Sequence, residues 1–121
     1  MLQAEQLRQR TKQFALAVLG LVRDLPRTDE ARVLGRQLLR SGTSLAANYR
    51  AACRARSKAE FISKMSVVIE ETDETEFWLE LSTESGMVAS ARTAELLREV
   101  GELLAIFVAS RRTARGERGK E

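Results

Sequence analysis

Apolar residues recur every three or four positions along most of this chain, and few residues interrupt the pattern. Such spacing puts them on one face of an α-helix, and the alternation typical of half-buried strands is absent. The single proline and two polar turns divide the pattern into four segments. We therefore predict helices over residues 5–24, 29–55, 58–83 and 90–112.

The expected ends of these helices have identifiable causes. Pro26 disfavours helix at the residue before it, so it ends the first segment. Thr28 or Asp29 can then cap the second helix with a side-chain oxygen. Ser57 followed by Glu60 is the pattern of a capping box, which predicts the start of the third helix.

Four long helices with short links predict an all-α fold, an antiparallel up-down-up-down four-helix bundle. The 121 residues support one domain. We expect the bundle to occupy residues 1–112. Residues 113–121 lack an apolar anchor and are predicted to form a disordered basic tail.

Gly35 and Gly42 lie on or beside the apolar face of the second predicted helix. Each glycine costs on the order of 1 kcal/mol in helix propensity relative to alanine. Close approach of a neighbouring helix explains them, and so does simple tolerance within a long helix.

Several classes of function lack their chemistry here. The chain has no histidine, so the Glu-x-x-His ligands of a di-iron bundle are missing. No nucleophile–base pair, phosphate-binding loop or dinucleotide fingerprint occurs. We predict no catalytic residue, no metal and no cofactor, and hence no enzyme.

The expected compartment is the cytosol. No run of about 18 apolar residues predicts a membrane span, and the first residues do not resemble a signal peptide. The single cysteine, Cys53, cannot form an internal disulfide, which suits a reducing compartment.

Charge separates sharply between the second and third predicted helices. Residues 32–58 contain no carboxylate, whereas residues 60–84 contain eight carboxylates and one base, Lys64. Placed at about 100° per residue, six bases share a stripe about 80° wide. We call them the basic stripe: Arg32, Arg36, Arg40, Arg50, Arg54 and Lys58.

Two readings of the basic stripe stay open. The bases can form a solvated face that pairs loosely with the acidic third helix of the same or another subunit. Alternatively they bind nucleic-acid phosphate, since arginine suits bidentate phosphate contacts. No aromatic residue lies beside the stripe, so binding of RNA or DNA would depend on charge rather than on base identity.

The third predicted helix is apolar on more than one side. A monomeric bundle buries only one face of each helix, so the surplus predicts a subunit interface. Four residues carry this prediction: Ile62, Ile69, Phe77 and Leu81.

Polar residues of the second and third helices are also expected to meet. A half-buried carboxylate needs donors, and Asn, Ser and the Trp ring N–H can supply them. The predicted structural polar network comprises Ser44, Asn48, Glu71, Glu74 and Trp78.

Two segments resemble a bacterial family of small four-helix-bundle proteins, which includes the proteins encoded in intervening sequences of 23S rRNA genes. The first runs from Arg40 to Ala52 with the sequence RSGTSLAANYRAA. The second contains the sequence FISKM at 61–65 and EETDETEFWLEL at 70–81. They are similar to the family's Phe-Ile-x-Lys and Glu-Thr-x-Tyr-Trp-Leu signatures, with Phe77 where the family commonly has Tyr.

The resemblance implies an antiparallel four-helix bundle and a homopentameric ring. A more distant similarity, to the accessory variability protein of diversity-generating retroelements, implies association with nucleic acid. The leading hypothesis is therefore a non-enzymatic oligomeric structural or adaptor protein that binds RNA or DNA through the basic stripe. The alternative is a protein–protein scaffold without nucleic-acid affinity.

Overall fold

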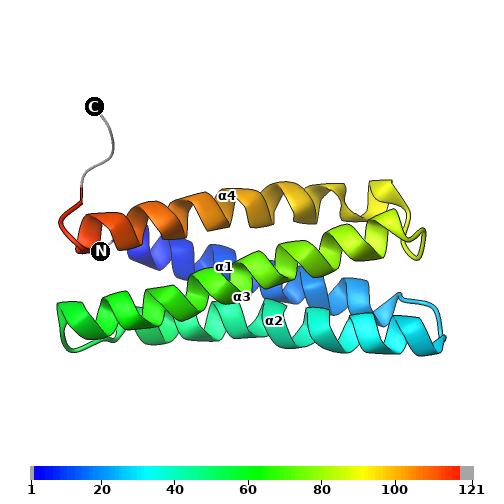
Figure 1. Ribbon diagram of the computed structural model, residues 1–121, viewed down its shortest axis with the longest axis horizontal. Helices are drawn as coiled ribbons and strands as arrows, with labels where there is room; N and C mark the ends of the chain where they lie inside the picture. Colours follow the sequence, from blue (N-terminus) through cyan, green and yellow to red (C-terminus); the bar gives the residue numbers. More distant parts are fainter. Residues whose placement is uncertain (1, 118–121) are drawn as a thin grey trace.

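The computed structural model describes residues 2–117, which form four α-helices in an antiparallel bundle (Figure 1). Their bounds are α1 Leu2–Arg23, α2 Asp29–Cys53, α3 Lys58–Glu84 and α4 Ser90–Ala114. The predicted all-α, up-down-up-down fold is confirmed. The tail boundary stays a prediction, because α4 continues to Ala114 and residues 118–121 lie outside the described residues.

Local hydrogen bonds account for where the helices begin. The Thr28 hydroxyl accepts a bond from the Ala31 N–H at 3.1 Å and caps α2. Ser57 accepts one from the Glu60 N–H at 3.0 Å, as the capping box predicts. Glu60 reaches back to the N–H of Arg56 instead of that of Ser57, at 2.9 Å.

The end of α3 depends on a glycine. Gly86 adopts a φ of 82°, which side-chain-bearing residues rarely adopt. Its N–H donates to the Thr83 carbonyl at 3.1 Å, and the Val88 N–H donates to the Ser82 carbonyl at 3.2 Å. These bonds satisfy carbonyls at the helix end and turn the chain back into α4.

Aliphatic side chains from all four helices make up the core. Its fully buried members include Val18 on α1, Leu38 and Leu45 on α2, Leu79 on α3, and Leu103 on α4. The Tyr49 ring stacks on Phe107 with ring centroids 5.4 Å apart, which joins α2 to α4.

Hydroxyl side chains also lie in the core and form hydrogen bonds there. Thr72 donates to the Val68 carbonyl at 2.7 Å, within its own helix. Between helices, the Thr75 and Ser41 hydroxyls lie 2.8 Å apart and join α3 to α2. These bonds offset the cost of burying the hydroxyl groups.

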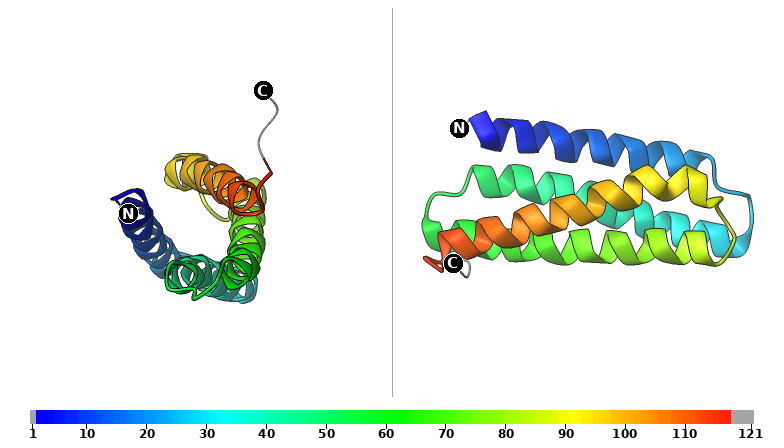
Figure 2. Two further views of the ribbon diagram at one scale, coloured as in Figure 1. Left: turned by 90° about the vertical axis from the view of Figure 1, so that its left-hand side faces the viewer. Right: turned by 90° about the horizontal axis from the view of Figure 1, so that it is seen from above.

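The four helices are not equally in contact. Each helix packs along its neighbour in the chain, but the contact between α1 and α4 is the sparsest of the four. Viewed from the end, α1 and α4 stand apart, and α4 runs obliquely across the bundle (Figure 2). Arg10 crosses this side, with nitrogen–oxygen distances of 2.8 Å to Glu99 and 2.9 Å to Glu102.

No helix within residues 2–117 is both long and apolar enough to span a membrane.

Two glycines of α2 lie against neighbouring side chains. A methyl group built on Gly42 would lie 2.9 Å from Val18 Cγ1, and on Gly35 it would lie 3.0 Å from Leu25 Cδ1. Val18 is fully buried and β-branched, so its side chain cannot turn away. Of the two explanations for Gly42, close approach of a neighbouring helix therefore applies.

Replacing Gly42 with alanine should destabilise the protein by about 1–3 kcal/mol, because overpacking outweighs the gain in helix propensity. Urea denaturation measures the change. Adding Val18→Ala should make the double variant more stable than the sum of the two single changes predicts.

Gly20→Ala is the matched control, since nothing lies within 4 Å of the added methyl group. It should stabilise the protein by up to about 1 kcal/mol. An equal stabilisation by Gly42→Ala would contradict the close contact with Val18.

Candidate nucleic-acid interface

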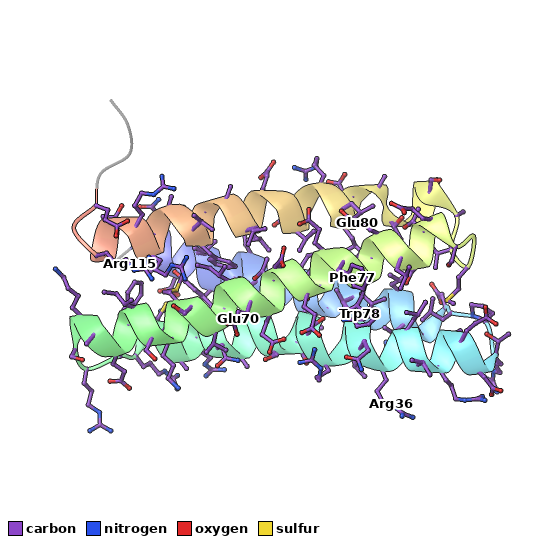
Figure 3. All side chains as sticks on the ribbon, in the orientation of Figure 1. Arg36, Glu70, Phe77, Trp78, Glu80 and Arg115 are labelled. Atoms are coloured by element: carbon purple, nitrogen blue, oxygen red, sulfur yellow. The ribbon has the colours of Figure 1, made fainter. Side chains whose placement is uncertain are left out.

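All six bases of the basic stripe are exposed: four lie on α2, Arg54 directly follows it, and Lys58 is at the start of α3. Figure 3 shows Arg36 projecting from α2 away from the bundle. Among the described residues, two members pair with carboxylates. Arg32 pairs with the exposed Asp29 one turn earlier, and Arg40 reaches across to α3.

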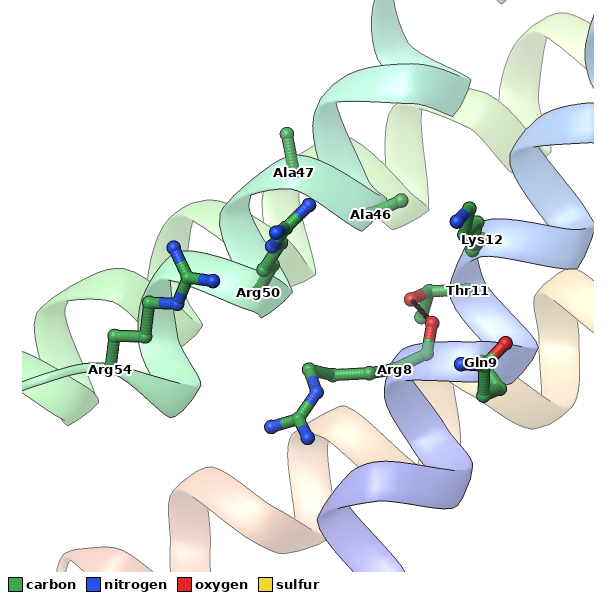
Figure 4. A pocket seen from close by; sticks show the side chains of 8 residues that line it. All are labelled: Arg8, Gln9, Thr11, Lys12, Ala46, Ala47, Arg50 and Arg54. Atoms are coloured by element: carbon green, nitrogen blue, oxygen red, sulfur yellow. Dashed lines mark hydrogen bonds between the residues drawn. The ribbon is translucent and has the colours of Figure 1, made fainter.

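Arg50 and Arg54 border a hollow of about 500 Å³ between α1 and α2 (Figure 4). Bases from α1 stand on its other side, and the alanines of α2 leave space between them. We call this the first hollow, lined by Arg8, Gln9, Thr11, Lys12, Ala46, Ala47, Arg50 and Arg54.

The first hollow is electrostatically one-sided. Its lining includes four bases and no carboxylate. Arg8 bonds to the exposed Glu5 at 3.0 Å, one turn away on the same helix. Like charges focused in a concave surface attract anions more strongly than the same charges spread over a convex one.

Sequence reasoning identified Arg50 and Arg54 but missed Arg8 and Lys12. The two missed bases are one helical turn apart, so they share a face of α1. That signal was present in the sequence. It becomes informative only when the α1 face that meets α2 is known, which depends on packing.

Arg40 bridges α2 and α3. Its guanidinium donates to Glu71 at 3.1 Å and lies 2.5 Å from Glu74. The Glu71 side chain is 19% exposed, so this ion pair is partly shielded from water. The hydrogen bond from Arg40 lowers the pKa of the Glu74 carboxyl below its usual value.

Members of the predicted polar network make polar contacts in separate parts of the structure. Asn48 donates to the Ser44 carbonyl at 2.9 Å and to its hydroxyl at 3.0 Å, within α2. Glu71 and Glu74 instead form ion pairs with Arg40, which is a member of the basic stripe. Contacts that join Asn48 to the glutamates stay a prediction.

Trp78 has a buried ring nitrogen with no hydrogen-bond partner in the described structure. The nearby Trp78 N–H lowers the pKa of the Glu74 carboxyl, as Arg40 also does. The position of this N–H relative to Glu74 nevertheless falls short of hydrogen-bond geometry. An unsatisfied buried N–H costs free energy, so a small shift of Glu74 towards the ring would be favourable.

The four predicted interface residues of α3 differ in exposure. Phe77 is 51% exposed and Leu81 is 38% exposed. Ile69 packs partly against the core, and Ile62 is half-buried. Phe77 also contacts the Trp78 ring edge-on at 5.0 Å, on the same stretch of α3 (Figure 3).

Residues 2–117 contain no cluster of three or more side chains suited to binding a metal. Beyond the ion pairs, two of the described residues have shifted pKa values. Burial raises the pKa of the Tyr49 hydroxyl, and burial beside Glu80 and Asp73 raises that of the Glu76 carboxyl. Neither belongs to a nucleophile–base arrangement among the residues described.

Replacing Arg40 with methionine should cost about 1 kcal/mol at neutral pH, as expected for a largely exposed ion pair. Because the pKa of Glu74 is lowered in the folded state, this carboxylate stabilises the fold at pH values above the ordinary glutamate pKa, which is near 4.3. That contribution disappears as pH falls through the lowered value. Urea denaturation should therefore show less acid-induced loss of stability for Arg40→Met than for the wild type.

Arg32→Met is the control, because its partner Asp29 is fully solvated and on the same helix. It should leave the acid-induced loss unchanged. If Arg40→Met shows the wild-type loss between about pH 5 and pH 3, the bridge does not stabilise the fold.

Comparisons with known proteins agree with this architecture. The chain is similar to a crystal structure of a protein of unknown function from the S23 ribosomal protein family of Bacteroides thetaiotaomicron. The two share 28% sequence identity and a TM-score of 0.83, over 90% of this chain and 97% of that one. No curated protein shows significant similarity to the chain. The more distant similarity to the accessory variability protein stays a prediction.

Residues 4–109 match the family model described as 23S rRNA-intervening sequence protein. This match spans all four helices, including both segments that carried the resemblance in the sequence. The chain belongs to the 23S rRNA-intervening sequence protein family.

Proposed function

We propose that this protein is a non-enzymatic, self-associating cytosolic bundle that binds the phosphate backbone of nucleic acid between α1 and α2. The observation that carries this proposal is the first hollow, where Arg8, Lys12, Arg50 and Arg54 meet without a carboxylate in the lining. Phosphate is the ligand that such a cluster of guanidinium and ammonium groups fits best.

The kind of recognition follows from the residue types. The lining of the first hollow contains no aromatic residue on which a base could stack. Binding there is therefore electrostatic and tolerant of sequence. The name of the family refers to 23S rRNA, and that of its S23 relative refers to a ribosomal protein family, which supports testing RNA before DNA.

Self-association is the second part of the proposal. Phe77 and Leu81 expose apolar surface one turn apart on α3. The exposed Glu80 lies one turn after Phe77, and the exposed Glu70 lies two turns before it. A neighbouring copy that presents apolar and basic side chains outside the groove between α1 and α2 would meet both features. Such a contact joins two different faces and forms a ring where the rotation between copies closes, and the family resemblance suggests five copies.

The pure scaffold remains the competing proposal, and one observation favours it. Arg40 already pairs with Glu71 and Glu74, as expected if the basic stripe forms ion pairs with acidic helices. On this reading, the other bases pair with α3 of a neighbouring copy, and no nucleic acid binds.

Arg50→Glu with Arg54→Glu should weaken RNA binding at low salt, for all sequences alike, because the change reverses charge at the first hollow. For the unmodified protein, log affinity should fall linearly with log salt, by about 0.7 to 0.9 per phosphate contact. Fluorescence anisotropy of labelled RNA and DNA measures both effects.

Two controls accompany this experiment. Arg56→Glu with Arg112→Glu makes the same charge change at exposed positions away from the hollow. A variant that ends at Ala114 removes the bases of the tail. Binding that disappears with the tail alone, or equally in both charge variants, would contradict the assignment to the first hollow.

Light scattering should give the unmodified protein a mass several times 13.5 kDa, and five times for the suggested ring. Phe77→Gln with Leu81→Gln should shift it towards the monomer, since it removes the exposed apolar surface of α3. Val33→Gln, at an apolar α2 residue that is 58% exposed, is the control and should leave the mass unchanged. A monomeric wild type would refute self-association.

A further inference from the structure

A second hollow lies between the same two helices, at their other end. Its volume is about 490 Å³, and it too has four bases and no carboxylate in its lining. The four bases are Arg23, Arg27, Arg32 and Arg36. Neither the basic stripe nor the proposed function accounts for Arg23 and Arg27.

The two hollows differ in one respect. The first is lined mainly by polar and charged groups, with two alanines between them. The lining of the second includes Val22, Leu25 and Leu39 together with its four arginines. A lining that combines apolar side chains with planar cations suits an unstacked base, because arginine planes can stack on bases and aliphatic carbons can cover them.

The spacing of the hollows sets the size of a ligand that fills both. Arg36 and Arg50 are 14 residues apart on α2, or about 21 Å at 1.5 Å per residue. At about 3.4 Å per nucleotide, that distance corresponds to roughly six stacked nucleotides, or fewer in a stretched strand. Each hollow has the volume of a pocket for one small ligand, which suits single nucleotides and excludes a duplex.

We propose that a single strand of nucleic acid lies along the seam between α1 and α2, with phosphates in the first hollow and a base in the second. This inference rests on the proposed function and deepens it by naming the ligand and its path. Charge complementarity carries it, since each hollow has four bases and no carboxylate in its lining, and the carboxylates that pair with Arg8 and Arg32 lie outside the linings.

The test compares single-stranded oligouridylates from dinucleotide to dodecanucleotide, bound to the full chain and to Arg23→Ser with Arg36→Ser. Both arginines are exposed, so the fold should survive, and thermal melting checks this. Affinity should rise steeply with length until the strand spans both hollows. The variant should lose that rise in affinity with length. For long strands, its slope of log affinity against log salt should be shallower by about 0.7 for each phosphate contact that is lost.

Arg56→Ser with Arg112→Ser is the matched control for lost charge away from the seam. A strand of equal length without bases should bind the unmodified protein roughly tenfold more weakly, as expected when a small apolar area stays in water. The seam variant should show no such difference between the two strands.

The failures are distinguishable. If no oligonucleotide binds the unmodified protein, the proposed function itself is wrong. If the first hollow is required but Arg23→Ser with Arg36→Ser behaves like the control, the proposed function stands and the bridging strand is wrong. Equal binding of a duplex, or equal competition by polyglutamate, would also overturn the single-strand assignment.

Discussion

The contact of Val18 with Gly42 brings α1 and α2 close together, and the shape of their outer surface depends on it. Small residues follow one another along the side of α2 that faces α1, namely Gly35, Gly42 and Ala46. The floor of the seam is therefore deep. Long side chains such as Arg8 and Arg50 stand at its edges, so hollows remain between them.

Charge is distributed over the seams in a regular way. Arg10 of α1 meets Glu99 and Glu102 of α4, and Arg40 of α2 meets Glu71 and Glu74 of α3. In each case one arginine joins two glutamates three residues apart, which share a helix face. Along the α1–α2 seam, bases stand at both edges of the hollows, and among the described residues no pair of glutamates joins them across the seam. The apolar contacts beneath offset the repulsion between these bases.

Much of this fold was predictable because it depends on local patterns. Periodicity located the helices, and Pro26 and Ser57 marked their boundaries. The site was less predictable. Pairing of the basic stripe with the acidic third helix was one of the two readings left open, but one helical wheel cannot show that Glu71 and Glu74 lie opposite Arg40. Arg8 and Lys12 were missed for the same reason, since the pairing of α1 with α2 sets which bases face each other.

The sparse contact between α1 and α4 has a consequence for the order in which the bundle comes apart. The other three seams join consecutive helices, so each closes a short loop. The α1–α4 seam closes nearly the whole chain, which costs the most loop entropy for the smallest gain in packing. Amide hydrogens of α1 should therefore exchange with solvent sooner than those of α3, because the bundle opens along this edge while the α2–α3 hairpin is still folded.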